Sequence, residues 1–464
     1  MRLAKMAKRI FVLGLDAFDP KLCFEKFKAE LPNLSKLMKN SSWGISNSSI
    51  PPLSCTAWIS FAKGKTPGHS AIQGFTSRKD FAYTDFFVAN STIIEKERLW
   101  DILAEQGKKC IVMNVPVTFP PYDVNGIMVS SFLTPNADKE YCYPKEIKQE
   151  INEIANGYVI DVKGFKKKPK NVVLKELKGM EEKRFKVAKH FIENKDWEFF
   201  IFVTTGTDRI HHAFWADMDE THPDHKADTE FKDAILSYYK FIDEKIGEVA
   251  SLLGEEDVLL IMSDHGAREM HGFVNVNEFF IKEGYMKMQE YPSEPTLFNE
   301  TKVDWNNTKV FCTGNYIARI FVNLKGREPQ GIVKKEDYEK FRDEIKEKLL
   351  TIRDEQGKKM NTKVFKREEV YKGKYVASQP DLIIYFDDLK WGANQMIGFN
   401  ELFSHNADKG RNSANHYHKG MFLLHNAGLE AGKRSEINLI DLMPTIIRLL
   451  DCEVPTAVEG KSLV

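Results

Sequence analysis

FFIFVTTGTDRIHHAFWAD, residues 199–217, holds a strand-like run and a helix-like run in immediate succession. The first part is aromatic and β-branched, which is typical of a buried strand. Thr205-Gly206-Thr207 breaks that run, and helical spacing begins at Asp208. Asp208 and His212 are four residues apart, so on a helix they lie on the same face, one turn apart. A carboxylate and an imidazole placed in this way after a strand predict a metal chelate, whereas the ordinary alternative is a side-chain pair on a solvated helix.

Two other apolar runs lead into acidic residues. Residues 9–15 predict a strand that is followed by Asp16, and residues 257–262 predict a strand that is followed closely by Asp264 and His265. A single Asp after a strand usually caps a helix. Three of them, each near a histidine or at a strand end, indicate a shared site instead.

The alternation of strands and helices predicts the fold class. It favours an α/β protein with a mostly parallel central sheet and helices on both faces. In such sheets, sites form at the carboxyl ends of the strands. A further imidazole, that of His416, lies just ahead of the last clear strand, residues 420–425. We therefore expect three carboxylates and three imidazoles to meet at one edge of the sheet.

This ligand set predicts the cofactor. Six mixed oxygen and nitrogen ligands are too many for one tetrahedral ion and suit two divalent ions, an arrangement typical of phosphoryl transfer. Zn²⁺ is the first choice for Asp and His ligands, and Mn²⁺ is the second.

A nucleophile candidate lies in PPLSCTAW, residues 51–58. A hydroxyl in the first turn of a helix benefits from the positive end of the helix dipole and from free backbone N–H groups. Ser54 and Thr56 both qualify, although each could simply cap the helix. Cys55 is a weaker thiol candidate because no basic residue adjoins it in sequence.

Length and composition limit the class of protein. The 464 residues suit one large α/β domain with insertions. Residues 138–195 predict a helical surface excursion, and residues 286–380 a possible inserted α+β subdomain. The 67 basic and 67 acidic residues leave no net charge, so no nucleic-acid-binding patch is indicated. The sequence does not indicate an oligomeric state.

Cysteine spacing and hydropathy predict the compartment. The six cysteines are scattered without a CxxC motif, which favours reduced thiols. No apolar run approaches the length of a membrane span. We therefore expect a cytoplasmic protein that acts on a small phosphorylated substrate.

Other parts of the chain predict individual elements. Residues 20–39 and 226–253 have helical periodicity, residues 380–386 predict a strand, and residues 405–419 predict a polar loop.

The motifs together resemble the type I phosphodiesterase/nucleotide pyrophosphatase family of the alkaline phosphatase superfamily. The blocks that carry the resemblance occur in order along nearly the whole chain, and they include GLDAFDP (14–20), PPLSCTAWISFAKGKTPG (51–68), NVPVTFPP (114–121), FVTTGTDRIHHAFWADMDETHP (202–223), VLLIMSDHGA (258–267), QPDLIIYF (379–386), HYHKGM (416–421) and NLIDLMPTIIRLL (438–450). The SDHG motif alone is only moderately specific, but the ordered set is highly specific.

The resemblance implies an alkaline-phosphatase-like core and a metal-dependent phosphodiesterase or nucleotide pyrophosphatase that acts through a phosphoserine intermediate. It also implies two ligand sets, which are Asp16, Ser54, Asp264 and His265 for one metal and Asp208, His212 and His416 for the other. The family's nucleophile usually lies ten residues before a glycine, and counting back from Gly64 gives Ser54, with Thr56 in reserve.

Departures from the family pattern reduce the number of candidate site residues and of possible superfamily branches. Many relatives have a histidine where this chain has Ser70, so the neighbouring His69 is a weak site candidate. The sulfatase branch is disfavoured because its Pro and Arg are missing after Ser54 and Cys55. The remaining histidines considered, for which we expect surface or supporting roles, are His211, His271, His405, His418 and His425.

Two alternatives remain open at this stage. One is a phosphomonoesterase or a phosphoglycerate-mutase-like phosphotransferase, because one superfamily core serves all these reactions. The other is a binding protein that retains metal without turnover.

Overall fold

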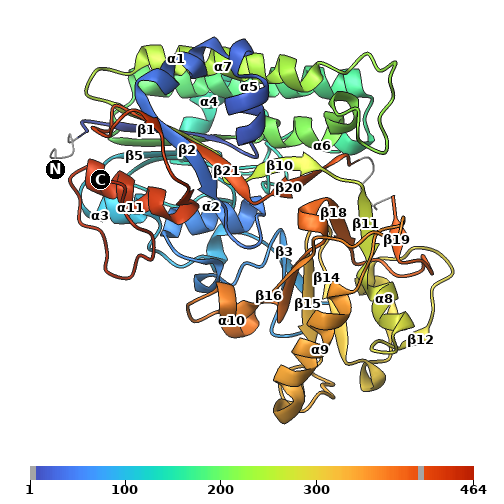
Figure 1. The fold of residues 1–464 in the computed structure, drawn as a ribbon. Helices are drawn as coiled ribbons and strands as arrows, with labels where there is room; N and C mark the ends of the chain where they lie inside the picture. The colour runs from blue at the N-terminus through green and yellow to red at the C-terminus, as the bar shows by residue number, and fades with distance from the viewer. Residues whose placement is uncertain (1–6, 406–411) are drawn as a thin grey trace.

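The computed structural model describes residues 7–405 and 412–464. It has a larger part built on one wide sheet and a smaller part built on a narrower sheet (Figure 1). Ala7, the first described residue, donates its backbone N–H to the Leu449 carbonyl at 2.9 Å, so the two ends of the described chain meet on the larger part. In the described residues, no helix has both the length and the apolar character that crossing a bilayer requires.

The wide sheet holds ten of the described strands. From one edge to the other, the strands are β22 (Gly432–Lys433), β2 (Ser41–Asn47), β21 (Lys419–His425), β9 (Val258–Met262), β1 (Ile10–Leu15), β8 (Phe199–Thr204), β5 (Cys110–Met113), β6 (Gly126–Val129) and β7 (Cys142–Tyr143). The tenth strand, β23 (Ile437–Asn438), also pairs with β2. Strands β9, β1, β8, β5 and β6 run parallel, while β21 and β7 run antiparallel to their neighbours. The predicted mostly parallel sheet is therefore confirmed.

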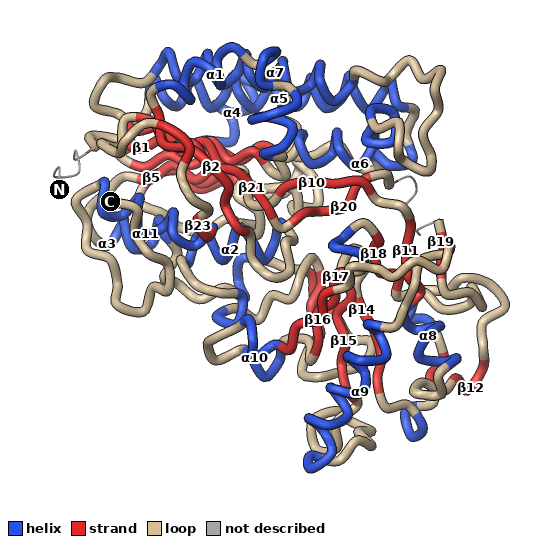
Figure 2. The backbone as a smooth tube through the Cα atoms, in the orientation of Figure 1, coloured by secondary structure: helices blue, strands red, loops and turns tan. Residues whose placement is uncertain are grey.

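Helices cover both faces of this sheet (Figures 1 and 2). One layer contains α1 (Pro32–Lys39), α4 (Ile147–Ala155), α5 (Lys170–Asn194), α6 (Gly206–Met218) and α7 (Ala234–Leu252), and the other contains α2 (Ser54–Lys63), α3 (Leu99–Glu105) and α11 (Leu442–Leu449). Strand β1 shows why its sequence is apolar throughout. Ile10 and Val12 join the core beneath the second layer, whereas Phe11, Leu13 and Leu15 join the core beneath the first.

Residues 138–195 supply part of the first helical layer. Apolar side chains of α4 and α5, including Ile151, Leu177 and Phe185, are buried in the same core as β1 and β8. These helices therefore cover the sheet rather than standing away from it.

The smaller part has its own apolar core. A four-stranded antiparallel sheet runs in the order β14 (Val310–Thr313), β15 (Ala318–Val322), β17 (Leu382–Tyr385) and β16 (Lys363–Lys366), and α8 (Val276–Lys282) and α9 (Tyr338–Leu350) contribute to the core. The predicted strand at 380–386 thus belongs to this sheet. A ribbon of β10 (Gly266–Glu269) and β20 (Ala414–Tyr417) lies between the two parts (Figure 1).

The predicted helix at 20–39 is wrong as one continuous element. It divides into a π-helix at Leu22–Lys26, a 3₁₀ turn at Lys28–Glu30 and α1. Pro32 explains the last break, because a residue before proline avoids the helical region, and Leu31 has φ −119° and ψ 73°.

Two other boundaries differ from prediction. Helix α7 begins at Ala234 instead of residue 226, because residues 226–233 form turns in which Thr229 Oγ1 donates to Asp217 Oδ1 at 2.6 Å. The predicted polar loop at 405–419 contains strand β20, which pairs with β10. Residues 406–411 of that loop lie outside the described residues.

Candidate metal centre and nucleophile

Three neighbouring parallel strands bring the acidic residues to one edge of the sheet. In register, Leu15 of β1 pairs with Thr204 of β8, and Gly14 pairs with Met262 of β9. The strands therefore end level with one another. Asp16, the first turn of α6 and the segment after β9 leave the sheet at the same place, where sites form in parallel sheets.

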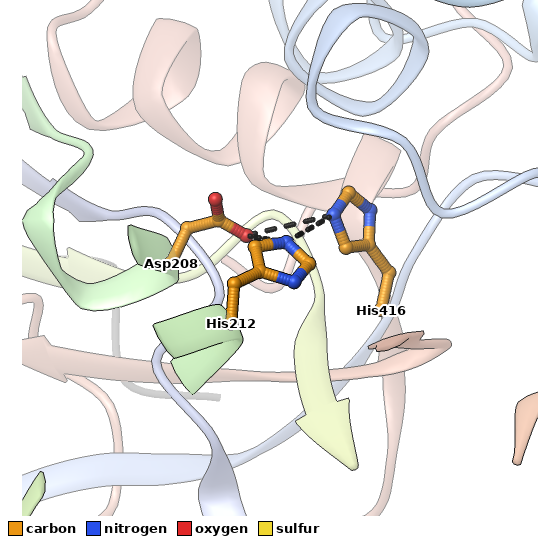
Figure 3. Close-up of side chains that lie close together, drawn as sticks. All are labelled: Asp208, His212 and His416. Atoms are coloured by element: carbon orange, nitrogen blue, oxygen red, sulfur yellow. Dashed lines mark hydrogen bonds and ion pairs between the residues drawn. The ribbon is translucent and has the colours of Figure 1, made fainter. Parts of the chain in front are cut away.

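Asp208, His212 and His416 form one buried group, here called the Asp208 triad (Figure 3). Asp208 Oδ1 lies 3.2 Å from His212 Nε2 and 3.5 Å from His416 Nε2. The two Nε2 atoms are 3.3 Å apart. Helix α6 supplies the first two residues and β20 supplies the third, since His416 stands opposite Ala267 in the ribbon.

Asp16, Asp264 and His265 form a second buried group, here called the Asp16 triad. His265 Nε2 lies 3.5 Å from Asp16 Oδ1 and 3.4 Å from Asp264 Oδ2. The imidazole rings of His265 and His416 stack with their centroids 4.1 Å apart, so the two triads adjoin. All six predicted ligand residues are thus gathered into two groups of three.

Ser54 lies against the Asp16 triad. It is the first residue of α2, and its Oγ donates to Asp16 Oδ1 at 3.2 Å and lies 3.4 Å from His265 Nε2. Trp58, one turn further along α2, donates its indole N–H to Asp16 Oδ2 at 3.2 Å. The start of α2 therefore holds both the serine hydroxyl and one oxygen of the neighbouring carboxylate.

Backbone carbonyls fix the tautomer of each histidine in the triads. The Nδ1 atoms of His265, His416 and His212 lie 2.9 Å from the carbonyl oxygens of Gly266, Pro52 and Ala414, respectively. A carbonyl oxygen only accepts, so each Nδ1 carries the proton. In the neutral ring, Nε2 then presents a lone pair to the carboxylates, which is the arrangement that metal-binding histidines use.

A positive charge between the facing lone pairs and carboxylate oxygens would stabilise both triads. Asp264 Oδ2 is buried and makes no hydrogen bond. Burial and repulsion from Asp264 and Asp208 raise the pKa of Asp16 well above its usual range, and burial raises the pKa of Asp264 to about 6. Burial also lowers the pKa of His416 well below its usual range. The donor set therefore fits divalent cations, with three Asp or His donors for each.

Arg209 is a contact of the site that the sequence reasoning missed. Its Nη1 lies 2.5 Å from Asp208 Oδ2, and its Nη2 lies 3.4 Å from Asp161 Oδ2. Burial disfavours ionised Asp208, but the contacts with His212 and Arg209 outweigh burial and hold the pKa of Asp208 well below its usual range. The sequence carried no signal for Arg209, because only tertiary packing places its guanidinium between Asp208 and Asp161.

The competing candidates at the start of α2 lie outside the triads. Thr56 Oγ1 is 2.9 Å from the carbonyl oxygens of both Pro51 and Leu53. Cys55 is buried among apolar side chains, and burial raises the pKa of its thiol far above the usual range. Cys55 belongs to neither of the two groups that hold the six ligands.

The other histidines that were considered also lie outside the triads. His69 is half-buried and pairs with Glu459 at 3.1 Å. His211 is buried, with its Nε2 3.0 Å from the Tyr239 hydroxyl. Three of the remaining four make other contacts. His405 is exposed beside Glu355, His425 lies beside Ser41, and His271 lies near Trp391. His418 stacks near Tyr385.

Comparison with known proteins identifies the family. A family profile described as type I phosphodiesterase/nucleotide pyrophosphatase matches residues 10–413. The chain belongs to this family. It is a phosphoester hydrolase of the phosphodiesterase and pyrophosphatase type, and the sequence-based recognition is confirmed. No curated protein matches it by sequence.

Solved structures share the fold of this phosphodiesterase. Murine ectonucleotide pyrophosphatase/phosphodiesterase 5, in an inactive form complexed with AMP, aligns with a TM-score of 0.56 and 13% identity over 97% of this chain and 96% of its own. The human protein of the same name aligns with a TM-score of 0.52 and 15% identity over 98% and 97% of the two chains. These alignments cover both the larger and the smaller part.

Proposed function

We propose that this phosphodiesterase uses Ser54 as its nucleophile and holds two divalent cations, one in each triad. The observation that carries the proposal is the position of Ser54 Oγ, within 3.4 Å of both Asp16 and His265 at the start of α2. When bound, the cations would lower the pKa of the serine hydroxyl and neutralise charge on the phosphoryl group.

The protein groups suit an in-line displacement. Asp16 Oδ1 accepts the hydrogen bond of Ser54 and so orients the lone pairs of Oγ. Ser54 Oγ forms a bond to phosphorus while the bond from phosphorus to the leaving oxygen breaks, which gives a phosphoserine. Water then attacks the phosphorus, the bond from phosphorus to Ser54 Oγ breaks, and the phosphate monoester leaves as the serine hydroxyl is restored. Arg209, half-buried beside Asp208, holds the carboxylate of the second triad in place during both steps.

The proposed metals are Zn²⁺ first and Mn²⁺ second. Each triad offers a mixture of carboxylate and imidazole donors, which suits both ions. Ser54 Oγ would supply a further ligand to the cation at Asp16.

The proposed substrate is a small phosphodiester or nucleotide pyrophosphate. The family membership supports this class, and the murine relative is complexed with AMP. The enzyme reconstituted with Zn²⁺ or Mn²⁺ should be given bis(4-nitrophenyl) phosphate, ATP and 4-nitrophenyl phosphate. We expect faster turnover of the diester and of the α,β-pyrophosphate bond than of the monoester.

Each other outcome of that panel favours a different function. Preference for the monoester would favour a phosphomonoesterase. Transfer of phosphate to an added alcohol in place of water would favour a phosphotransferase. Two bound metal ions with no turnover of any substrate would favour a binding protein.

We also propose that the enzyme works in the cytoplasm. All six cysteines are unpaired, and five of them are buried, which suits a reducing compartment. Fractionation of cells with an antibody against the protein tests this, and recovery from an oxidising compartment would contradict it.

A further inference from the structure

A cavity of about 340 Å³ lies beside the candidate active site, between the larger and smaller parts. Its lining includes Leu53, which directly precedes Ser54, and Tyr316. The Tyr316 ring stacks on His416 with centroids 5.0 Å apart. A group bound at the triads could therefore extend past these two side chains into the cavity.

Arg319 is the one charged residue among those that line the cavity. It lies on β15 and is only 6% exposed. Its Nη1 donates to the carbonyl oxygen of Thr76 at 2.6 Å, while its Nε is buried without a hydrogen-bond partner. In residues 7–405 and 412–464, no carboxylate forms an ion pair with this guanidinium.

Comparison with the other buried arginines shows that a buried guanidinium without a carboxylate partner is unusual in this protein. Six arginine side chains are buried in the part of the chain that the structure describes, and five of them have a carboxylate partner. These pairs are Arg78–Glu328 at 3.3 Å, Arg98–Asp101 at 2.6 Å, Arg184–Glu181 at 3.5 Å, Arg342–Glu368 at 2.7 Å and Arg367–Asp381 at 3.0 Å. Arg319 is the exception.

An unpaired buried charge is costly, so its retention points to a partner outside the chain. Burial lowers the pKa of Arg319 to about 10, which still leaves the guanidinium charged at neutral pH. A planar guanidinium binds a carboxylate or a phosphate through paired hydrogen bonds. Asn299, Asn315 and Gln395, whose side chains carry amide groups, also line the cavity.

The apolar walls limit what else can enter. Phe75, Phe86, Leu297 and Phe298 line the cavity together with Tyr316. A ligand that fits here combines an apolar or aromatic stem with a terminal oxyanion.

We propose that this cavity is a subsite for a second oxyanion, a carboxylate or a phosphate, carried on an ester substituent of the substrate. Arg319 is its specificity-determining residue. The inference rests on the proposed function, because the phosphorus of the same substrate must then lie at the triads.

The test compares matched 4-nitrophenyl phosphodiesters with the metal-loaded enzyme. The second ester group is an n-alkyl chain, an ω-carboxyalkyl chain or an ω-phosphonoalkyl chain of the same length, over a series of lengths. We expect kcat/KM for at least one anionic ester to exceed that for the alkyl ester by about tenfold or more. The carboxylate and phosphonate arms identify which oxyanion the subsite prefers.

Arg319→Gln removes the charge but keeps an amide donor for the Thr76 carbonyl. We expect the ratio of anionic to alkyl kcat/KM to fall to near one in this variant. Arg353→Gln, which changes an exposed arginine of the smaller part, should keep the wild-type ratio. If R319Q does not fold, R319K keeps the charge without the planar fork, and its ratio should fall below the wild-type value.

Two results would contradict the assignment of this cavity as an oxyanion subsite. One is the absence of any preference for an anionic ester in the wild-type enzyme. The other is a preference that persists in both Arg319 variants. If no diester is turned over, the proposed function fails separately. Titration of Ser54→Ala protein with the corresponding methylphosphonate monoesters would then still measure the Arg319-dependent preference.

Discussion

Ser54 and Thr56 lie two residues apart, and their hydroxyl groups face different surroundings. Ser54 Oγ faces Asp16 and His265, whereas Thr56 Oγ1 lies within hydrogen-bond distance of backbone carbonyls. We expect Ser54→Ala to reduce turnover by at least about three orders of magnitude while metal content is kept. Acid quench and peptide mapping should place the phosphate on Ser54.

Thr56→Val is the matched variant for that experiment. It should keep most activity and lose about 1 kcal/mol of unfolding free energy, because the hydrogen bond from the Thr56 hydroxyl to a backbone carbonyl is lost. A phosphate mapped to Thr56, or an inactive but folded Thr56→Val protein, would contradict the assignment of the nucleophile.

Removing one ligand residue should empty one triad of its cation and leave the other triad occupied. Asp264→Ala should lose the cation at the Asp16 triad, and His416→Ala the cation at the Asp208 triad, so each variant should retain about one equivalent of metal. Activity should fall by orders of magnitude in both, because charge stabilisation and positioning are lost together. Elemental analysis and turnover measure these effects. The exposed His405→Gln variant serves as the control and should keep two equivalents.

The thiol at the start of α2 should be dispensable. Cys55 is buried among Ile59, Ile72 and Val117, and its raised pKa keeps it protonated. We expect Cys55→Ala to keep full activity per folded molecule and to lose roughly 1 kcal/mol of stability through the small cavity left behind. A folded Cys55→Ala enzyme without turnover would show that the sulfur takes part in the reaction.

At the scale of elements, Asp19 ties the turn after β1 to the ribbon. Its Oδ1 accepts from the Leu22 amide at 3.0 Å and its Oδ2 from the Ala267 amide at 3.3 Å. Burial nevertheless raises the pKa of Asp19 to about 6. Because this pKa is higher in the folded state than in the unfolded chain, its contribution to stability is full at low pH. That contribution is lost as the pH rises from about 4 to about 6.

Asp19→Asn should remove this dependence. Between pH 4 and pH 7, the unfolding free energy of the wild type should fall relative to that of the variant by up to roughly 3 kcal/mol. Urea unfolding across this range measures the change. A difference that stays constant with pH would show that Asp19 has an ordinary pKa.

Parallel strands explain why the sequence predicted that three of the carboxylates come together. Asp16, Asp208 and Asp264 each follow an apolar run, and neighbouring parallel strands must bring such residues to one edge. The position of His416 depended on a ribbon that the sequence did not indicate, because β20 lies in a polar stretch. Arg209 and Asp161 were missed for a related reason, since only the tertiary packing brings them together.

In the fold, too, the elements marked by local sequence were predicted, and those that depend on distant partners were missed. Strands β1, β8 and β9 were predicted because burial on both faces makes their sequences apolar throughout. Strand β2 was missed because its sequence, SSWGISN, is mostly polar or small, although it pairs with β21 along its whole length. Arg319 carried no signal of its own, because only packing reveals that its charge is unpaired.

At the scale of the whole molecule, the triads connect segments that are distant in sequence. The ligands come from the end of β1, from α6, from the segment after β9 and from β20. Cations bound by the folded protein alone would stabilise it by about 2.7 kcal/mol for each site at a hundredfold excess over Kd. We expect chelation to lower Tm by several degrees and added Zn²⁺ or Mn²⁺ to restore it.

The control for that measurement is a variant that has already lost a ligand. His416→Ala should show a smaller response to the chelator than wild type, because only one cation remains to be removed. Equal shifts in the two proteins, measured by calorimetry, would show that His416 holds no cation.

The order of the ligands along the chain also affects how the protein is made. The Asp16 triad is complete in sequence once His265 has been synthesised, whereas the Asp208 triad also needs His416, which comes much later in the chain. On the ribosome, the nascent chain would thus acquire its two sites one after the other. A product truncated before β20 would lack His416 and also strand β21, which lies between β2 and β9 in the wide sheet, so we expect it to be inactive.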